Sequence, residues 1–156
     1  MKNYTLFIIG SLLMAACAGQ QSASVDAAKS QIEAFAEAYF NYDFHEAEQY
    51  VIPESERWLR FAASNTTEHD LQLVQEEGEA IVDVDDFFTV ANDTLRIVQL
   101  RVRNFVSATL PADSAQRVDE ALFNITTVLR DGKWKVRMEG LPQSEKQSRD
   151  WDEGAK

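Results

Sequence analysis

Two polar residues interrupt the apolar faces of two predicted strands and are the first candidates for chemistry. In the alternating stretch 80–90, Asp86 shares the apolar face, and in the stretch 95–108 Asn104 does the same. A carboxylate in an apolar cavity has a raised pKa and can act as a general acid or base, or grip a ligand. Three tyrosines from the helical half would add hydroxyl groups to such a pocket: Tyr39, Tyr42 and Tyr50.

The register of the hairpin that carries Asp86 decides whether its carboxylate points inward. Taking residues 92–94 as a three-residue loop places opposite charges across the strands, which stabilises a sheet by roughly 0.2–1 kcal/mol a pair. This register sets three pairs face to face: Asp83 with Arg103, Asp85 with Arg101, and Asp86 with Leu100. A β-bulge at Asp85 and Asp86 is the alternative, and it would turn both acids outward. A pocket mouth open to water is a second alternative.

No arrangement for metal binding, phosphate binding or nucleophilic catalysis is visible. The two histidines, His45 and His69, stand apart, and "HEAEQ" lacks the second histidine of a zinc-binding helix. The six glycines are scattered rather than gathered in a phosphate loop or a nucleophile elbow. We therefore expect no metal ion and no cofactor, and we interpret both histidines as surface residues.

The chain is strongly acidic, with 15 lysines and arginines against 26 aspartates and glutamates, a net charge of −11. Such a domain repels phosphate backbones, so nucleic acid is excluded as a partner. The acidity keeps the domain soluble, and a cationic ligand or partner is the alternative interpretation. Five basic residues share the outer face of the predicted sheet: Arg101, Arg103, Lys133, Lys135 and Arg137. This face is either solvated or a docking face for an acidic partner.

Helical periodicity, followed by strand periodicity, places these residues on elements. Apolar residues recur at three- and four-residue steps over residues 25–40, after a predicted N-cap at Ser24. A second helix starts at Asp43, a third at Pro53, and a short fourth covers 68–75. The period then changes to two, which predicts four antiparallel strands at about 80–90, 95–108, 119–130 and 133–139.

The last of these hairpins has the clearest turn. Asp131-Gly132 suits a two-residue type I′ loop, because glycine tolerates a positive φ. This loop fixes the register and puts three pairs on one apolar face: Leu129 with Trp134, Thr127 with Val136, and Ile125 with Met138. The opposite face, which carries Lys135 and Arg137, is expected to be exposed to water.

The N-terminus has the features of an export signal. The apolar run 6–16 is shorter than the roughly 20 residues that span a bilayer, and it ends on small residues, as a signal peptide does. The only cysteine, Cys17, follows directly, and a thiolate is a good nucleophile for alkylation. "LMAAC" resembles the lipobox of bacterial lipoproteins, in which the cysteine receives a diacylglycerol and the preceding peptide is removed.

This resemblance implies a lipid-anchored envelope protein. Ala18, in place of an aspartate, implies the outer membrane facing the periplasm, and two or more acyl chains make a stable anchor. Residues 1–16 are then a signal peptide, 17–24 the lipidated cysteine and a flexible tether, 25–140 a single domain, and 141–156 a polar charged tail. A lipidated chain would hold no free thiol, so it would form no disulfide bond and use no cysteine in catalysis.

Helices followed by a long-stranded antiparallel sheet resemble the nuclear-transport-factor-2-like superfamily of cystatin-like α+β cones, and in particular its small bacterial lipoprotein domains of unknown function. Two stretches carry the resemblance, "FAEAYFNYDFHEAEQYVIPE" and "LRDGKWKV". It implies that a curved sheet of four main strands wraps the N-terminal helices over residues 25–140, with ligands bound between sheet and helix. It implies almost nothing about activity, because this scaffold hosts enzymes, binders and scaffolds alike.

The leading hypothesis is a non-enzymatic envelope lipoprotein whose cone binds a small ligand or another envelope protein. The rival is an isomerase- or hydrolase-type enzyme that uses Asp86 with a tyrosine. An open pocket would favour the enzyme, and a filled cone would favour a docking module. Separately, Thr94 and Ser114 follow aspartates in predicted loops, which is the loose acid–hydroxyl–apolar pattern of O-glycosylation in one group of Gram-negative bacteria.

Overall fold

Helices and strands occupy separate halves of the chain. The computed structural model describes residues 16–92, 94–107 and 115–145, and the side chains of residues 16–25, 77 and 86–92 lie outside this description. The helical half consists of α1 (Ala16–Phe40), α2 (Phe44–Ala47), α3 (Glu56–Asn65) and α4 (Glu68–Glu77), with 3₁₀ turns at Glu48–Tyr50 and Pro53–Ser55. The strand half consists of β1 (Ile81–Asn92), β2 (Leu95–Ser107), β3 (Gln116–Arg130) and β4 (Lys133–Arg137).

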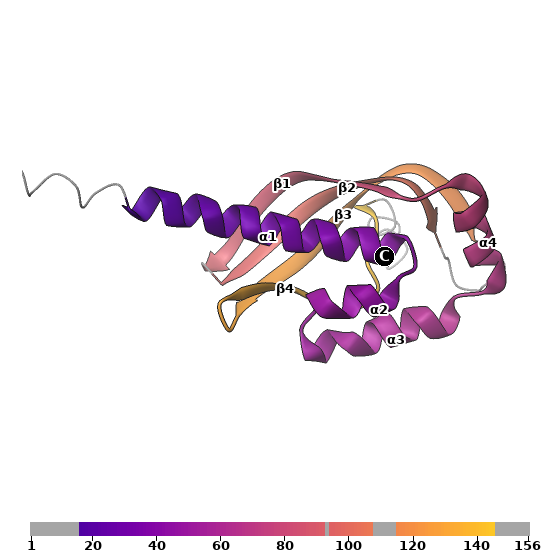
Figure 1. The fold of residues 1–156 in the computed structure, drawn as a ribbon, viewed down its shortest axis with the longest axis horizontal. Helices are drawn as coiled ribbons and strands as arrows, with labels where there is room; N and C mark the ends of the chain where they lie inside the picture. The colour runs from indigo at the N-terminus through magenta and orange to yellow at the C-terminus, as the bar shows by residue number, and fades with distance from the viewer. Residues whose placement is uncertain (1–15, 93, 108–114, 146–156) are drawn as a thin grey trace, which may run out of the picture.

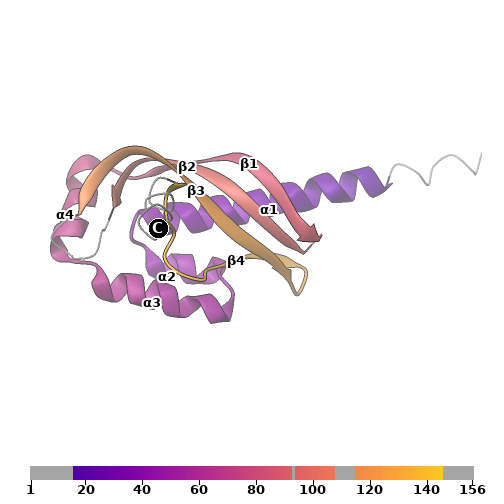
Figure 2. The ribbon, with the colours of Figure 1, turned by 180° about the vertical axis from the view of Figure 1, so that it is seen from behind.

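The strands form one curved antiparallel sheet whose spatial order, β1-β2-β3-β4, repeats the order along the chain. α1 lies along one face of this sheet, and its first turns project past the strands at the end opposite to α4 (Figure 1). Seen from behind, the other face of the sheet lies in front of α1 (Figure 2). This is the predicted α+β arrangement of N-terminal helices and four strands. No helix within the described residues is long and apolar enough to cross a bilayer.

The core lies between α1 and the sheet. Buried α1 residues recur at helical spacing, and buried β2 residues at every second position, because each element turns one side inward. The residues are Ile32, Phe35, Ala36 and Phe40 from α1, and Val98, Leu100 and Val102 from β2. Burying each large apolar side chain contributes about 1.5–3 kcal/mol, so this contact holds the helix on the sheet.

α1 begins earlier than predicted. The predicted N-cap at Ser24 is wrong, because the helix runs from Ala16 through the stretch 18–24 that the sequence marked as a tether. That stretch is rich in alanine and glutamine, which favour a helix. The start of α2 is confirmed, because the Asp43 carboxylate accepts the Glu46 N–H at 3.0 Å as its N-cap.

The predicted β3–β4 hairpin is confirmed as far as the pair of Thr126 with Arg137, but the predicted pair of Ile125 with Met138 does not form. Leu129 pairs with Trp134, and the two turn residues Asp131 and Gly132 have φ angles of +53° and +73°. Both positive values define the type I′ loop that the Asp-Gly pair predicts. The inward residues of β4 are buried, whereas Leu129, near the turn, is 38% exposed.

The predicted register of β1 and β2 is wrong. Asp83 pairs with Arg101 rather than Arg103, and the ladder shifts between Val84 and Asp86. This shift is the bulge that the sequence left open as an alternative. An extra residue in one strand changes the register on either side of it, and an alternating hydrophobic pattern does not reveal its position.

The loop between β1 and β2 also differs from prediction. Asn92 pairs with Leu95, so the three-residue loop over 92–94 is wrong. The predicted ion pairs nevertheless form, between diagonal neighbours instead of direct ones. They are Arg103 with Asp83 at 2.7 Å, and Arg101 with Asp85 at 2.5 Å.

Candidate functional site

Aromatic side chains fill the space between α1 and the sheet, where the sequence predicts a ligand pocket. Phe40 from α1, Phe105 from β2 and Phe123 from β3 meet with ring centroids 5.5, 4.7 and 5.4 Å apart. Each of the three is at most 6% exposed. Rings at this spacing are in direct contact and leave no room for a ligand between them. The centre of the cone is therefore packed core in the part that the structure describes.

Tyr39 belongs to this core. Its ring stacks on Phe35 and meets Phe40 and Phe44 edge-on. Burial raises the pKa of its hydroxyl group, and the neighbouring Tyr42 raises it further. The Tyr39 hydroxyl therefore stays protonated near neutral pH and does not act as a base.

Tyr42 has a strained backbone at the end of α1. Its φ is +66°, in the left-handed region that glycine normally occupies, which costs another residue roughly 1–2 kcal/mol. The Asp43 N–H donates to the Ala38 carbonyl at 2.9 Å, and the Tyr42 N–H donates to the Tyr39 carbonyl at 3.2 Å. These two bonds form the Schellman ending of a helix. The Tyr42 hydroxyl donates to the Val106 carbonyl at 3.4 Å.

Asp70 is a buried carboxylate that the sequence analysis missed. It is 2% exposed and forms a capping box with Thr67 at the start of α4. Oδ2 accepts the Thr67 N–H at 2.6 Å, whereas Oδ1 has no hydrogen-bond donor among the described residues. Burial raises the pKa of the Tyr42 hydroxyl, and the nearby charge of Asp70 raises it further. The spacing Thr67-x-x-Asp70 signals the cap, but nothing in the sequence signals the burial.

Asn104 forms a structural junction instead of the predicted pocket wall. Its φ of +54° interrupts the alternation of β2. Its Oδ1 accepts the Arg117 Nε–H at 2.8 Å, and its Nδ2 donates to the Glu79 carbonyl at 3.2 Å. Arg117 also donates to the Gly78 carbonyl at 2.8 Å, just past the end of α4. The side chain therefore joins β2 to β3 and to the connection between α4 and β1.

The backbone of Asp86 lies opposite Gln99 rather than opposite Leu100. Gln99 directs its side chain away from the core and donates to Glu145 at 2.7 Å. The side chain of Asp86 itself lies outside the described residues. That Asp86 lines a pocket stays a prediction. The inward direction of its side chain was predicted from unbroken alternation along the strand, and the register shift beside Asp86 interrupts that alternation.

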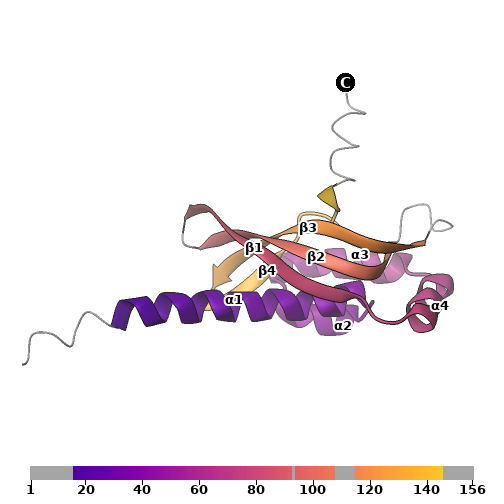
Figure 3. The ribbon, with the colours of Figure 1, turned by 90° about the horizontal axis from the view of Figure 1, so that it is seen from above.

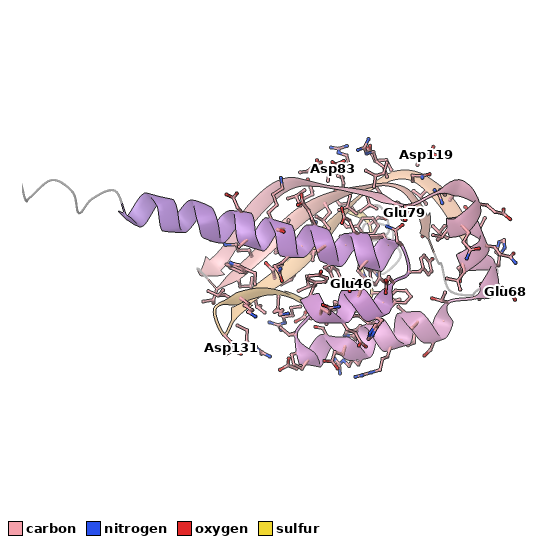
Figure 4. All side chains as sticks on the ribbon, viewed as in Figure 1. Glu46, Glu68, Glu79, Asp83, Asp119 and Asp131 are labelled. Atoms are coloured by element: carbon pink, nitrogen blue, oxygen red, sulfur yellow. The ribbon has the colours of Figure 1, made fainter. Side chains whose placement is uncertain are left out.

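A hollow of about 420 Å³, here called the acidic hollow, opens beside the C-terminal half of α1. Tyr50 and Asn41 contribute to its walls, which also carry four carboxylates: Glu37, Asp43, Glu46 and Glu79. Figure 4 labels two of these carboxylates, Glu46 on α2 and Glu79 just before the start of β1. None of the four carboxylates forms an ion pair with a described residue.

Of the three predicted tyrosines, Tyr50 lines the acidic hollow. Its hydroxyl donates to Glu46 Oε1 at 2.9 Å, and Gln49 Nε2 donates to Glu46 Oε2 at 2.6 Å. The hydrogen bond to Glu46 raises the pKa of the Tyr50 hydroxyl, with smaller contributions from burial and from the charges of Glu46 and Glu37. Glu46 is therefore held in place by two neutral donors, and none of the described residues pairs a cation with it.

The five basic residues predicted as a docking face are mostly engaged by neighbours. Four of them have partners: Arg101 with Asp85 and Glu120, Arg103 with Asp83, Arg137 with Glu139, and Lys135 with the Gln49 carbonyl. The two carboxylates beside Arg101 raise its pKa further. Lys133, at the turn before β4, is exposed. These residues form local pairs rather than one free positive patch.

The remaining candidates lie on the surface or outside the description. His45 and His69 are both exposed, as the sequence predicts. Within the described residues, no group of three potential ligands is placed to hold a metal ion. Thr94 is exposed, while Ser114 and the side chain of Cys17 lie outside the described residues.

Comparison with solved structures identifies the fold. The chain is similar to the crystal structure of an NTF-2-like protein of unknown function from Shewanella oneidensis MR-1. The TM-score is 0.50 at 13% identity, over 77% of this chain and 97% of that one. The chain has a nuclear-transport-factor-2-like fold. At this identity the likeness establishes the nuclear-transport-factor-2-like fold alone, because one fold serves many functions.

Two other structures are less similar. One is an Ntf2-like protein involved in plasmid conjugation, with a TM-score of 0.33 at 15% identity over 75% of this chain and 48% of that one. The other is a phospholipid-binding protein from Ralstonia solanacearum, with a TM-score of 0.29 at 16% identity over 86% of this chain and 84% of that one. Neither likeness is strong enough to bear on function. No protein-family model and no curated protein matches the sequence.

Proposed function

We propose that this nuclear-transport-factor-2-like domain is a lipid-anchored, non-catalytic binding module of the bacterial cell envelope. It binds a cationic ligand, or the cationic surface of an envelope partner, in the acidic hollow. The observation that carries the proposal is the hollow itself, where four carboxylates face one space with no ion pair to any described residue. The net charge of −11 also attracts cations to the domain over a longer range.

Electrostatics favours a ligand with more than one positive charge. Carboxylates around one hollow repel one another, and a bound cation relieves that repulsion. Two unit charges 4 Å apart interact by about 1 kcal/mol in water and by about 4 kcal/mol at the effective dielectric constant near a protein surface. A polyamine or a lysine-rich segment contacts several carboxylates at once, so it gains more than a single sodium ion does.

The packed core favours binding at the surface over catalysis inside the cone. The rival hypothesis, an enzyme that uses Asp86 with a tyrosine, needs a cavity between α1 and the sheet. Phe40, Phe105 and Phe123 occupy that space. Tyr39 has a raised pKa and stays protonated, so it does not supply the base either.

The geometry of α1 suits an anchor on Cys17. Cys17 lies in the first turn of α1, at the end that projects past the sheet (Figure 3). The acidic hollow lies beside the other end of the same helix. A lipid on Cys17 would therefore hold the domain with the hollow directed away from the bilayer, consistent with an outer-membrane lipoprotein facing the periplasm.

Mass spectrometry and fractionation test the anchor. We expect the protein extracted from membranes to have lost residues 1–16 and to carry acyl chains on Cys17. We also expect the Cys17→Ser variant to move from the membrane fraction to the soluble fraction. An intact mass that still includes the leader, or equal partitioning of the two proteins, would contradict the anchor.

Calorimetric titration with spermidine and with a lysine-rich peptide tests the hollow. We expect the full chain to bind both, more weakly as salt is added. Glu46→Gln combined with Glu79→Gln should weaken binding by about tenfold, or ~1.4 kcal/mol. Glu68→Gln combined with Asp131→Asn removes as much charge at sites away from the hollow (Figure 4) and is the control. Equal weakening by both pairs would show an effect of net charge alone and contradict the proposal.

A further inference from the structure

The chain forms an arch after β4. The last β3–β4 pair joins Thr126 to Arg137, and the next contact with β3 joins Phe123 to Ser144. On β3 these contacts are separated only by residues 124 and 125, whereas on the other side they are separated by residues 138–143. The longer segment has to leave the plane of the sheet, and residues 138–145 are here called the arch.

Both ends of the arch are fixed. At one end, the Met138 N–H donates to Ser55 Oγ at 2.8 Å in a buried position. At the other end, Ser144 pairs with Phe123, and the Glu145 carboxylate accepts from Gln99 at 2.7 Å. A segment held at both ends keeps its shape without a ligand, so a binding site beneath it loses little entropy when it is occupied.

A groove of about 650 Å³ lies between the arch and β3. This volume is within the range of roughly 300–1,000 Å³ that is typical of small-ligand sites. Leu141 and Pro142 give the groove apolar surface. It is also lined by three neutral polar side chains, which are Asn124, Thr126 and Gln143. No hydrogen bond joins these three side chains to another described residue, so their donors and acceptors are available.

The charged side chains of the groove are engaged by neighbours. Arg137 pairs with Glu139 at 2.5 Å, and Glu145 accepts the hydrogen bond from Gln99. The groove therefore offers no free cation for a phosphate or carboxylate group, and its Glu145 carboxylate already accepts a hydrogen bond from Gln99. In this respect it differs from the acidic hollow and selects a different class of ligand.

We propose that this arch groove is a second binding site and that it takes a neutral saccharide of about disaccharide size. Each amide of Asn124 and Gln143 offers two N–H donors and one carbonyl acceptor. Neighbouring sugar hydroxyls, which both donate and accept, match this pattern. Leu141 and Pro142 cover the apolar faces of the sugar rings. An extended peptide fits less well, because it needs an open strand edge, and β3 is paired to β2 on one side and faces the arch on the other.

Amide NMR spectra of the full chain, titrated with N,N′-diacetylchitobiose to about 10 mM, test the site at the weak affinities expected of small sugars. We expect shifts at residues 124–126 and 138–145 and in the side-chain amides of Asn124 and Gln143. Asn124→Ala combined with Gln143→Ala should weaken binding by about tenfold. Gln72→Ala combined with Gln75→Ala, two exposed amides on α4, is the matched control and should leave the affinity unchanged.

Three further titrations separate the alternatives. Cellobiose shows whether hydroxyl groups alone suffice, and binding of either disaccharide in the groove supports the proposal. Triglycine amide tests the peptide alternative, and its binding in place of both sugars would overturn the proposal. Spermidine should shift residues around the acidic hollow and leave the arch unchanged, so failure at one site is distinguishable from failure at the other. No shift with either sugar, or equal weakening by the control pair, would also overturn the proposal.

Discussion

The hydroxyl group of Ser55 binds both backbone polar groups of Met138. It accepts the Met138 N–H at 2.8 Å and donates to the Met138 carbonyl at 3.4 Å, and Ser55 is fully buried. Met138 follows the last residue of β4, so it has no strand partner on β3. One side chain from the helical half therefore takes the place of that partner and fixes the start of the arch.

Replacing Ser55 with alanine should destabilise the domain, because two buried backbone groups lose their partner. We expect the free energy of unfolding, measured by urea denaturation, to fall by about 1–3 kcal/mol. Ser64→Ala is the control, since the exposed Ser64 hydroxyl bonds only to a carbonyl of its own helix. Its effect should stay within about 0.5 kcal/mol. Equal losses for the two variants would argue against a clamping role for Ser55.

The left-handed backbone of Tyr42 predicts an unusual order of stabilities. Tyr42→Ala and Tyr42→Gly both remove the ring. Only the alanine variant still has a side chain that makes the positive φ at this position unfavourable. We expect the glycine variant to be the more stable by about 1 kcal/mol, after allowing for the greater entropy of glycine in the unfolded chain. At Arg60, inside α3, we expect the opposite order, with Arg60→Ala more stable than Arg60→Gly by about 1 kcal/mol. Denaturation curves of the four variants check both signs.

Glu54 and Arg130 predict a local pH dependence. Arg130 Nη1 contacts both carboxylate oxygens, at 2.9 and 2.8 Å, and these hydrogen bonds hold the pKa of Glu54 below its usual range. A lowered pKa means that the pair stabilises the fold above the usual glutamate pKa, and that this contribution is lost as the pH falls through the lowered value.

In the Arg130→Gln variant, the pKa of Glu54 should rise toward its ordinary value. Carboxyl-carbon NMR of Glu54, recorded between about pH 2 and about pH 6, measures the change. Arg60→Gln is the control, because Arg60 pairs with Glu56 instead. A Glu54 titration curve that does not move in Arg130→Gln would contradict the assigned cause.

The three phenylalanines inside the cone predict a large core effect. Phe40→Ala leaves a cavity between α1 and the sheet and should lower the free energy of unfolding by about 3–5 kcal/mol. Phe61, which is 41% exposed on α3, provides the comparison, and Phe61→Ala should cost much less. If Phe40→Ala cost no more than Phe61→Ala, the described packing of the cone centre would be wrong.

Local turn chemistry made one part of the sheet predictable. Asp131-Gly132 determines both the loop type and the pairing of β3 with β4, because only two residues lie between the strands. The β1–β2 hairpin lacks such a turn, and its ladder shifts at two places. Alternation then places the predicted partners on the same face of the sheet, but the register does not set them directly opposite each other. Arg101 and Arg103 accordingly reach their predicted aspartates across a diagonal.

The candidate site was less predictable than the fold. Tyr50 was predicted for a pocket inside the cone and instead lines the acidic hollow. The carboxylates around it come from α1, from the start of α2 and from the segment before β1, and only the folded chain brings them together. Asn104 was misplaced because one positive φ reverses the direction of its side chain. Asp70 lies in a polar helix whose sequence gives no sign that its carboxylate will be buried.

The chain-order arrangement of the strands determines how the fold assembles. Each strand pairs with the one before it, so the hairpins close short loops, and the β3–β4 turn can form early. The apolar face of α1 behaves differently, because Ile32 and Phe35 pack in one cluster with Val98 and Ile125, far along the chain. The chain is made from its N-terminus, and under the proposed function it is also exported in that order, so α1 emerges well before those partners. The apolar face of the helix therefore stays uncovered at first, and the core closes only after β3 has emerged as well.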